Sequence, residues 1–96
     1  MVKHVVCFQL KDASPQKCAE AKALLLTMRE KVPQVRQLTV DIDFLHSPRS
    51  YDLMLTVLVD DEQALQAYQQ DDYHCSVIKP YMHAARTASV AIDALV

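Results

Sequence analysis

The stretch YDLMLTVLV, residues 51–59, decides the fold, because it is the most hydrophobic run of the chain and alternates with the period of a strand. One face of the expected strand carries Tyr51, Leu53, Leu55, Val57 and Val59. Met54 and Leu58 make the opposite face apolar as well. A strand that is apolar on both faces is typical of the centre of a sheet that is covered on both sides.

The opening segment VKHVVCFQL, residues 2–10, repeats this pattern. One face of this second expected strand carries Val2, His4, Val6, Phe8 and Leu10. Val5 and Cys7 make the other face partly apolar. The sequence therefore predicts two central strands, residues 2–10 and 51–59, in one sheet.

A helix and a further strand are expected between these two segments. Ser14 is a good N-cap, and Pro15 is a good first helical residue. The apolar stripe that follows at helical spacing consists of Cys18, Ala21, Leu24, Leu25, Met28 and Val32. Pro33 ends the helix, residues 35–45 form a strand with one wet face, and residues 46–50 form a turn.

A second helix and a last strand are expected after residue 59. Asp60 is predicted to be the N-cap, with Gln63 closing a capping box, and the helix ends around residues 70–72. Residues 73–84 are predicted to form a short helical segment interrupted at Pro80, and residues 86–94 the last strand. The order β-α-β-β-α-(α)-β predicts an α+β, ferredoxin-like sandwich, which is a four-stranded antiparallel sheet with helices on one face.

This arrangement leaves one face of the two central strands without a helical cover. A chain of 96 residues buries only about two thirds of its surface by itself, and a wide apolar face is rarely left exposed. We therefore expect a homodimer in which two sheets pack face to face and form a dimeric α/β barrel.

Length and composition exclude several classes of protein. The 96 residues are expected to form a single domain, residues 1–96. No apolar run approaches the ~20 residues of a membrane helix, and no signal peptide opens the chain, so a cytoplasmic protein is expected.

The net charge of −2 and the scattered basic residues argue against nucleic-acid binding. The three cysteines lack CxxC spacing and are expected to be reduced, and the absence of glycine excludes glycine-rich phosphate loops.

A set of residues spread over the whole chain carries a family resemblance. They are Val2-Lys3-His4-Val5-Val6, Phe8, Lys11, Val32-Pro33-Gln34-Val35, Tyr51-Asp52-Leu53, Asp60, Glu62, Ala64, Leu65, Ala67, Tyr68, Tyr73, His74 and Asp93. In this order they resemble the stress-responsive A/B barrel (Dabb) family, whose members are small proteins that form dimeric α+β barrels. The family usually has His-Pro-x-His after the second helix, where this chain has Asp71-Asp72-Tyr73-His74.

The candidate catalytic residues are Tyr68 and His74, which are six residues apart across the end of the second helix. This spacing lets a phenol and an imidazole meet at a helix–loop corner, where histidine can act as a general base and a tyrosine hydroxyl can stabilise an oxyanion. Resemblance to a plant polyketide cyclase of the family implies that His74 takes the proton, Tyr68 positions the substrate and His4 lines the pocket. That enzyme has a further pocket histidine where this chain has Leu53.

The expected substrate-binding residues are His4, Val6, Phe8, Leu53, Val77 and Tyr81. Each polar candidate also has a structural explanation: His4 as a core histidine, Tyr68 as an aromatic at the edge of the core, and His74 as a residue that pins its loop. No metal site is expected, because the histidines and Cys75 lack the close spacing of zinc ligands. No cofactor is expected either.

Three functions remain open at this point. The first is binding of a small apolar or aromatic molecule in a pocket between sheet and helices. The second is a cofactor-free cyclase- or lyase-like enzyme that uses His74 and Tyr68 as an acid/base pair, and the third is a structural, stress-related oligomer. An enclosed cavity beside His4, Tyr68 and His74 separates the first two functions from the third.

Overall fold

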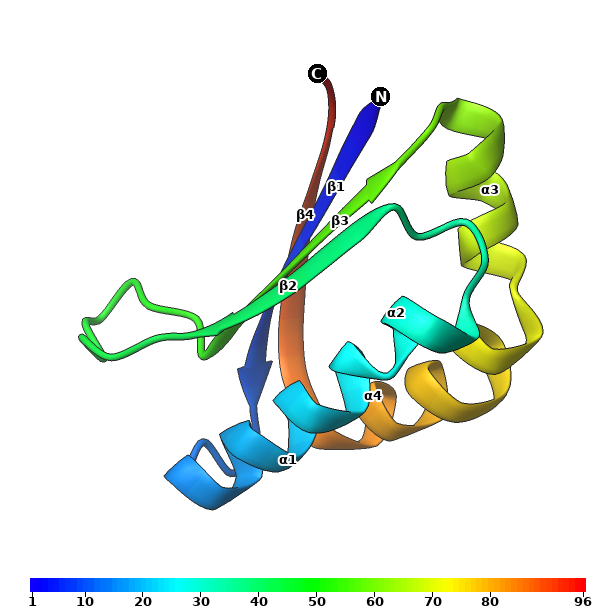
Figure 1. The fold of residues 1–96 in the computed structure, drawn as a ribbon. Coiled ribbons are helices and arrows are strands. Elements are labelled where there is room, and N and C mark those ends of the chain that lie inside the picture. The colour runs from blue at the N-terminus through cyan, green and yellow to red at the C-terminus, as the bar shows by residue number, and fades with distance from the viewer.

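The computed structural model describes residues 1–96 and has one four-stranded sheet with every helix on the same side of it (Figure 1). The strands are β1 (Val2–Leu10), β2 (Gln37–Ile42), β3 (Leu53–Val59) and β4 (Arg86–Leu95). Their order in the sheet is β2-β3-β1-β4, and each neighbouring pair is antiparallel. The prediction of two central strands is confirmed for residues 2–10 and for 53–59, whereas Tyr51 and Asp52, which were expected to open the second of them, precede β3.

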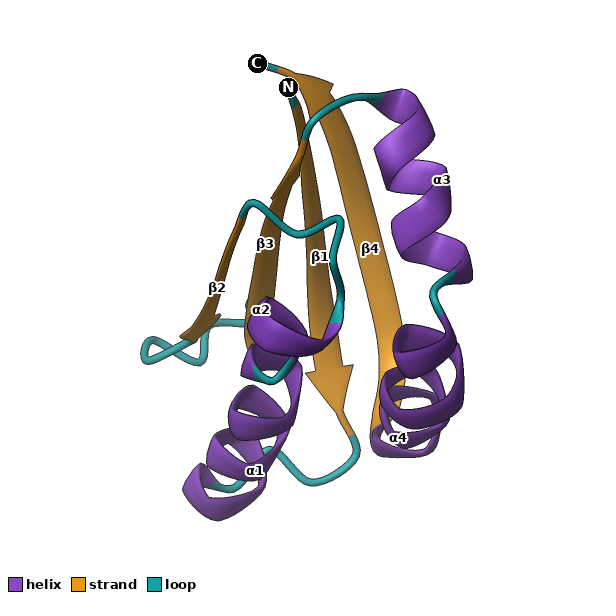
Figure 2. Cartoon of the chain, turned by 45° about the vertical axis from the view of Figure 1, so that its right-hand side comes forward, coloured by secondary structure: helices purple, strands orange, loops and turns teal.

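The helical layer lies against one face of this sheet (Figure 2). It consists of α1 (Pro15–Leu26), α2 (Met28–Lys31), α3 (Glu62–Gln70), the π-helical segment η1 (His74–Ile78) and α4 (Lys79–Ala85). This arrangement confirms the predicted α+β, ferredoxin-like fold. None of the helices combines the length and the apolar character needed to cross a membrane.

The core lies between the helices and the alternating residues of the central strands. Val2, Phe8 and Leu10 of β1 face the helices and are buried, as are all four odd-numbered positions of β3. The side chains of α1 that meet them are Cys18, Ala21 and Leu25. The period of two therefore predicted the core-facing side of both strands correctly.

The opposite side of the sheet has no helix against it, and we call it the open face. Its apolar residues are Val5, Cys7, Met54, Leu58, Val90 and Ile92. Met54 is 40% exposed, Val90 50% and Ile92 69%. A single copy of the chain therefore presents an apolar sheet surface to water.

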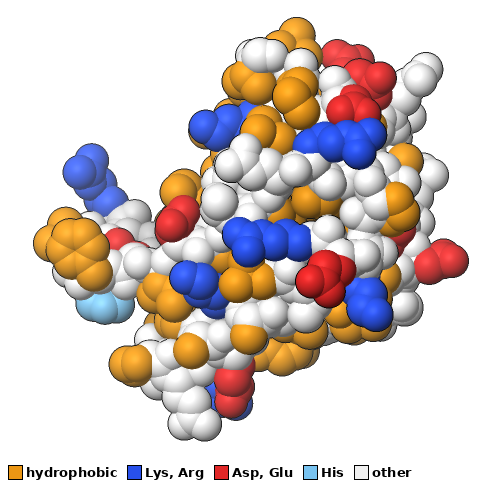
Figure 3. Space-filling view, in the orientation of Figure 1, with side chains coloured by type: hydrophobic (Ala, Val, Ile, Leu, Met, Phe, Trp, Pro, Cys, Tyr) orange, Lys and Arg blue, Asp and Glu red, His pale blue; other side chains and the backbone are white.

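The second strand is shorter than its sequence pattern predicted. β2 ends at Ile42, because the Asp43 carboxylate accepts a hydrogen bond from the backbone N–H of His46 at 2.7 Å and turns the chain. His46 has a positive φ of 53°. Phe44, which was expected on the strand, instead lies in the loop and is 87% exposed. This loop projects from the body of the molecule (Figure 3).

The helix starts agree with the sequence at α1 and differ by one residue at α3. The Ser14 hydroxyl accepts a hydrogen bond from Lys17 N–H, and Pro15 opens α1 as predicted. At α3 the cap is Asp61, whose carboxylate accepts a hydrogen bond from Ala64 N–H at 2.7 Å. Asp60, the predicted cap, instead forms a two-pronged ion pair with Arg36.

Pro80 does not interrupt the last helical segment. It lies in the first turn of α4, directly after the π turn of η1, where Lys79 N–H donates to the carbonyl of His74. A proline lacks the N–H that an α-helix needs and crowds the carbonyl four residues earlier. The wider π turn removes the bond that proline would break, so the helix continues through it.

Candidate functional site

A cavity of about 170 Å³ lies between the sheet and the segment formed by η1 and α4. Its lining residues are His4, Val6, Phe8, Leu25, Leu55, Tyr68, Gln69, His74, Ile78, Lys79, Met82, His83, Arg86 and Ser89. Val6, Phe8 and Leu55 make the strand side of the cavity apolar apart from His4, and further polar side chains come from α3, η1, α4 and β4. A cavity is thus present beside the three residues named from the sequence.

His74 is buried in η1, and its hydrogen bond identifies the position of its proton. Its Nδ1 lies 2.9 Å from the backbone carbonyl of Tyr68, which can only accept, so Nδ1 donates and the neutral ring keeps its lone pair on Nε2. Burial lowers the pKa of His74, and the charges of Lys79 and His4 lower it further, while the Tyr68 carbonyl and Asp71 act in the opposite direction. A neutral imidazole with a free Nε2 can accept a proton.

His4 is buried in β1 and is oriented by a carboxylate from the neighbouring strand. Asp93 lies directly opposite His4 in the β1–β4 pairing, and its Oδ1 accepts a close hydrogen bond from His4 Nδ1. The Asp93 side chain is 45% exposed, so it retains contact with water. This pair fixes the ring of His4 and leaves its Nε2 as the remaining polar atom.

Tyr68 lies between the two histidines but presents its ring rather than its hydroxyl. Its ring centre is 4.5 Å from that of His74 and 5.7 Å from that of His4. The hydroxyl donates instead to the sulfur of Met28 at 3.7 Å, and both side chains are fully buried. Burial raises the pKa of Tyr68, which keeps the phenol neutral. The polar tips of Tyr68 and His74 therefore do not converge on one point.

A β-bulge places Arg86 on the helical side of the sheet. The pairing of β1 with β4 runs regularly to Gln9 opposite Ala88, and the next pair is Leu10 opposite Arg86, so Thr87 is the extra residue. Leu10 is buried against the helices, and Arg86 opposite it lines the cavity. Without the bulge, Arg86 would share the side of Ala88 and Val90, which is the open face.

Only three of the six predicted substrate-binding residues line the cavity. His4, Val6 and Phe8 line the cavity from β1. Leu53 is buried in the core, and Leu55 occupies the β3 wall of the cavity. Val77 is 38% exposed. The stripe of η1 and α4 that faces the core consists of His74, Ile78 and Met82, and Val77 and Tyr81 each lie one residue before a member of this stripe.

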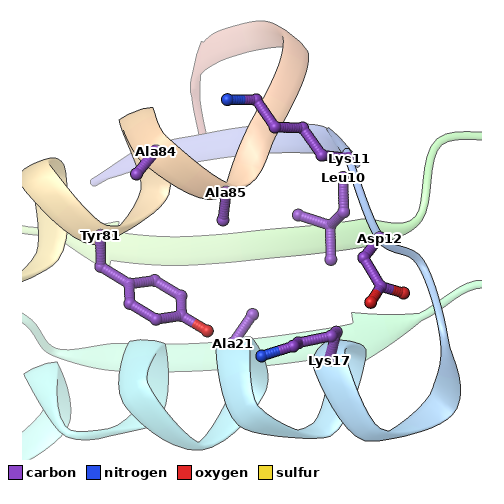
Figure 4. Close-up of a pocket in the computed structure, with 8 residues that line it drawn as sticks. All are labelled: Leu10, Lys11, Asp12, Lys17, Ala21, Tyr81, Ala84 and Ala85. Atoms are coloured by element: carbon purple, nitrogen blue, oxygen red, sulfur yellow. The ribbon is translucent and has the colours of Figure 1, made fainter.

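Tyr81 lines a different cavity, a groove of about 250 Å³ between α1 and α4. Figure 4 shows its ring reaching from α4 toward Ala21 and Lys17 of α1. The Lys17 ammonium is paired with Glu20 at 3.2 Å. Leu10, Ala21, Ala84 and Ala85 line the apolar part of this groove, and Lys11, Asp12 and Lys17 add charged side chains.

Sequence reasoning missed Asp93, Lys79 and Arg86 as neighbours of the histidines. The alternation of Ala88, Val90 and Ile92 put Asp93 on the other side of its strand, but the strand register that sets it opposite His4 is not readable from one sequence. The sequence pattern of residues 86–94 did not predict the bulge at Thr87. No group of three or more His, Cys, Asp or Glu side chains is placed to hold a metal ion.

The fold and the cavity define a class of protein: a ferredoxin-like α+β chain with helices on one sheet face and a histidine-lined cavity beneath them. The chain belongs to the stress responsive A/B barrel domain (Dabb) family, whose model matches residues 2–96. A search of the curated proteins found no match.

Solved structures share this fold at low sequence identity. One is a dimeric ferredoxin-like protein of unknown function from Thermobifida fusca, with 18% identity, coverage of 99% of this chain and 90% of that chain, and a TM-score of 0.84. A protein from Arabidopsis thaliana has 17% identity, 100% and 95% coverage, and a TM-score of 0.85. A Dabb family protein from Mesorhizobium loti has 20% identity, 99% and 95% coverage, and a TM-score of 0.76.

Proposed function

We propose that this chain forms a homodimer through its open face and that each copy binds a small, largely apolar molecule in the cavity between sheet and helices. The observation that carries the proposal is the cavity itself, half of whose lining residues are hydrophobic and which holds two oriented imidazoles. Binding sites for small molecules have this composition, because apolar surface supplies affinity and a few fixed polar groups supply orientation.

The volume of the cavity indicates the size of the ligand. At about 170 Å³ it is comparable with the ~150 Å³ apolar cavity that accepts benzene in an engineered protein. One ring, or an aliphatic chain of similar volume, fills it. Val6 and Phe8 of β1 and Leu55 of β3 would contact the apolar part of such a ligand.

The open face supports the homodimer. Val90 and Ile92 of β4 lie next to Cys7 and Val5 of β1, so exposed apolar side chains are contiguous across two strands. A second open face related by a twofold axis would cover them, with the two inner faces interdigitating as in a sandwich of two sheets. The similar protein from Thermobifida fusca is described as dimeric. The cavity lies on the other side of the sheet, so dimerisation leaves it accessible.

A second candidate function is proton-transfer catalysis of the cyclase or lyase type. The observation that favours it is the free Nε2 of a neutral, buried His74 beside the cavity. In this proposal His74 is the base. Tyr68 contributes only its ring, which packs against His74, because its hydroxyl is bonded to Met28.

The experiment that tests binding is a thermal-shift screen of single-ring and short-chain compounds, because a ligand that binds the native state raises the melting temperature. Ser89→Phe places an aromatic ring in the cavity, and Ala84→Phe does the same in the groove between α1 and α4. Ligands of the proposed site should lose their effect in Ser89→Phe and keep it in Ala84→Phe. A screen without any stabilising compound, or with the opposite pattern, would contradict the proposal and leave the structural oligomer as the better explanation.

A further inference from the structure

Apart from the neutral phenol of Tyr68, the ionisable side chains that line the cavity are basic. Lys79 and Arg86 carry positive charge, and His4, His74 and His83 are the other ionisable groups besides the phenol of Tyr68. No aspartate or glutamate lines the cavity, although the whole chain has a net charge of −2. The net charge of the residues that line this cavity is therefore opposite in sign to the net charge of the chain.

Of these groups, Arg86 is the one whose charged end is best placed to bind a ligand. The bulge at Thr87 turns it toward the cavity, and bulges near functional sites commonly re-aim a side chain in this way. Its guanidinium takes part in none of the ion pairs or side-chain hydrogen bonds of the chain, as is also true of Arg49 in the exposed loop, whereas Arg29 and Arg36 are both bonded. Arg86 is partly buried as a residue, and a guanidinium with five free donors matches the two oxygens of a carboxylate.

Lys79 supports the same interpretation from the helical side. Its ammonium donates one hydrogen bond to the carbonyl of Gln69 at 2.8 Å, which fixes its position and leaves two donors. Its charge is also one of the causes that lower the pKa of His74. Two carboxylates lie nearby without lining the cavity: Asp93 is bonded to His4, and Asp71 accepts a hydrogen bond from the backbone N–H of His74 at 3.1 Å.

We propose that the ligand of this cavity is a small organic anion, a carboxylate carried on a single ring or a short apolar chain, with Arg86 and Lys79 binding the carboxylate. This inference rests on the proposed function, because it needs a cavity that binds a small molecule. It adds the sign of the ligand's charge and names the residues that recognise it.

The test compares benzoate with benzamide, which has nearly the same size and shape but no charge. Dissociation constants are measured by NMR titration of the 15N-labelled protein, in the wild type and in Arg86→Gln. Benzoate should bind the wild type at least about tenfold more tightly than benzamide, and Arg86→Gln should remove that advantage. Arg49→Gln, in the exposed loop between β2 and β3, is the matched control and should leave both affinities unchanged.

Two further variants protect the result from a folding artefact. Arg86→Lys keeps the charge without the planar fork and should restore part of the preference for benzoate. Lys79→Gln removes a charge from the helical wall and should weaken benzoate but not benzamide. Equal affinity for the two probes, or a preference that Arg86→Gln leaves intact, would overturn this inference while leaving the proposed function standing. Failure of both probes to bind the wild type would overturn the proposed function and this inference with it.

Discussion

The substitution Ile92→Asp should dissociate the homodimer. Full burial of an isoleucine side chain contributes about 1.5–3 kcal/mol, and because Ile92 is 69% exposed in a single chain, about 1–2 kcal/mol of that is gained only on association. A twofold interface uses the residue twice, so the loss is about 2–4 kcal/mol, or about 30-fold to 1,000-fold in the dissociation constant. The aspartate also brings a like charge from each copy into the interface.

Sedimentation velocity over a range of protein concentrations measures this directly. The wild type should sediment as a dimer at micromolar concentration, and Ile92→Asp as a monomer that retains its far-ultraviolet circular dichroism. Val77→Asp is the matched control, because it places the same charge at an exposed valine on the helical side and should leave the dimer intact. A wild type that is monomeric, or an Ile92→Asp protein as dimeric as the wild type, would refute the account of the open face.

Three further predictions concern the histidine site and the helix cap. Burial lowers the pKa of His74 below 6.5, so the unfolded chain binds a proton more readily than the folded one. The wild type should therefore lose stability as the pH falls through about 6.5, and His74→Gln should lose less over the same range when unfolding free energies are measured in urea. Parallel pH profiles for the two proteins would count against this. Tyr68→Phe should lower the unfolding free energy by at most about 1 kcal/mol and leave ligand binding intact, because the only hydrogen bond of the Tyr68 hydroxyl is to the Met28 sulfur. Loss of binding would show that the hydroxyl does reach the ligand. Asp61→Ala should lower the unfolding free energy by about 1 kcal/mol and Asp60→Ala by less, and the reverse order would restore Asp60 as the cap.

The sequence predicted the layers of the fold because they depend on periodicity. Alternation in residues 2–10 and 51–59 fixed which side of β1 and β3 meets the helices, and Ser14 with Pro15 marked the start of α1. These signals are local, and the structure agrees with them. The same alternation in β4 left Val90 and Ile92 on the side without helices, which is the basis of the proposed dimer.

The details of the candidate site could not be predicted because they depend on register and on irregular turns. His4 and Asp93 meet through a strand pairing that joins the two ends of the chain. The π turn before Pro80 sets the side that Tyr81 faces, and the bulge at Thr87 sets the side that Arg86 faces. The π turn and the bulge each shift a side chain by a single position, and a shift of one residue is enough to move it to another surface.

The central claim is that the cavity beneath η1 and α4 holds a small molecule, and mapping a bound probe tests it most directly. In an NMR titration of the 15N-labelled wild type with benzoate, the account predicts that the largest shifts fall on amides of η1, α4 and the start of β4, with His74 and Ser89 among them. Shifts confined to the groove around Lys11 and Lys17, or to the open face, would contradict it.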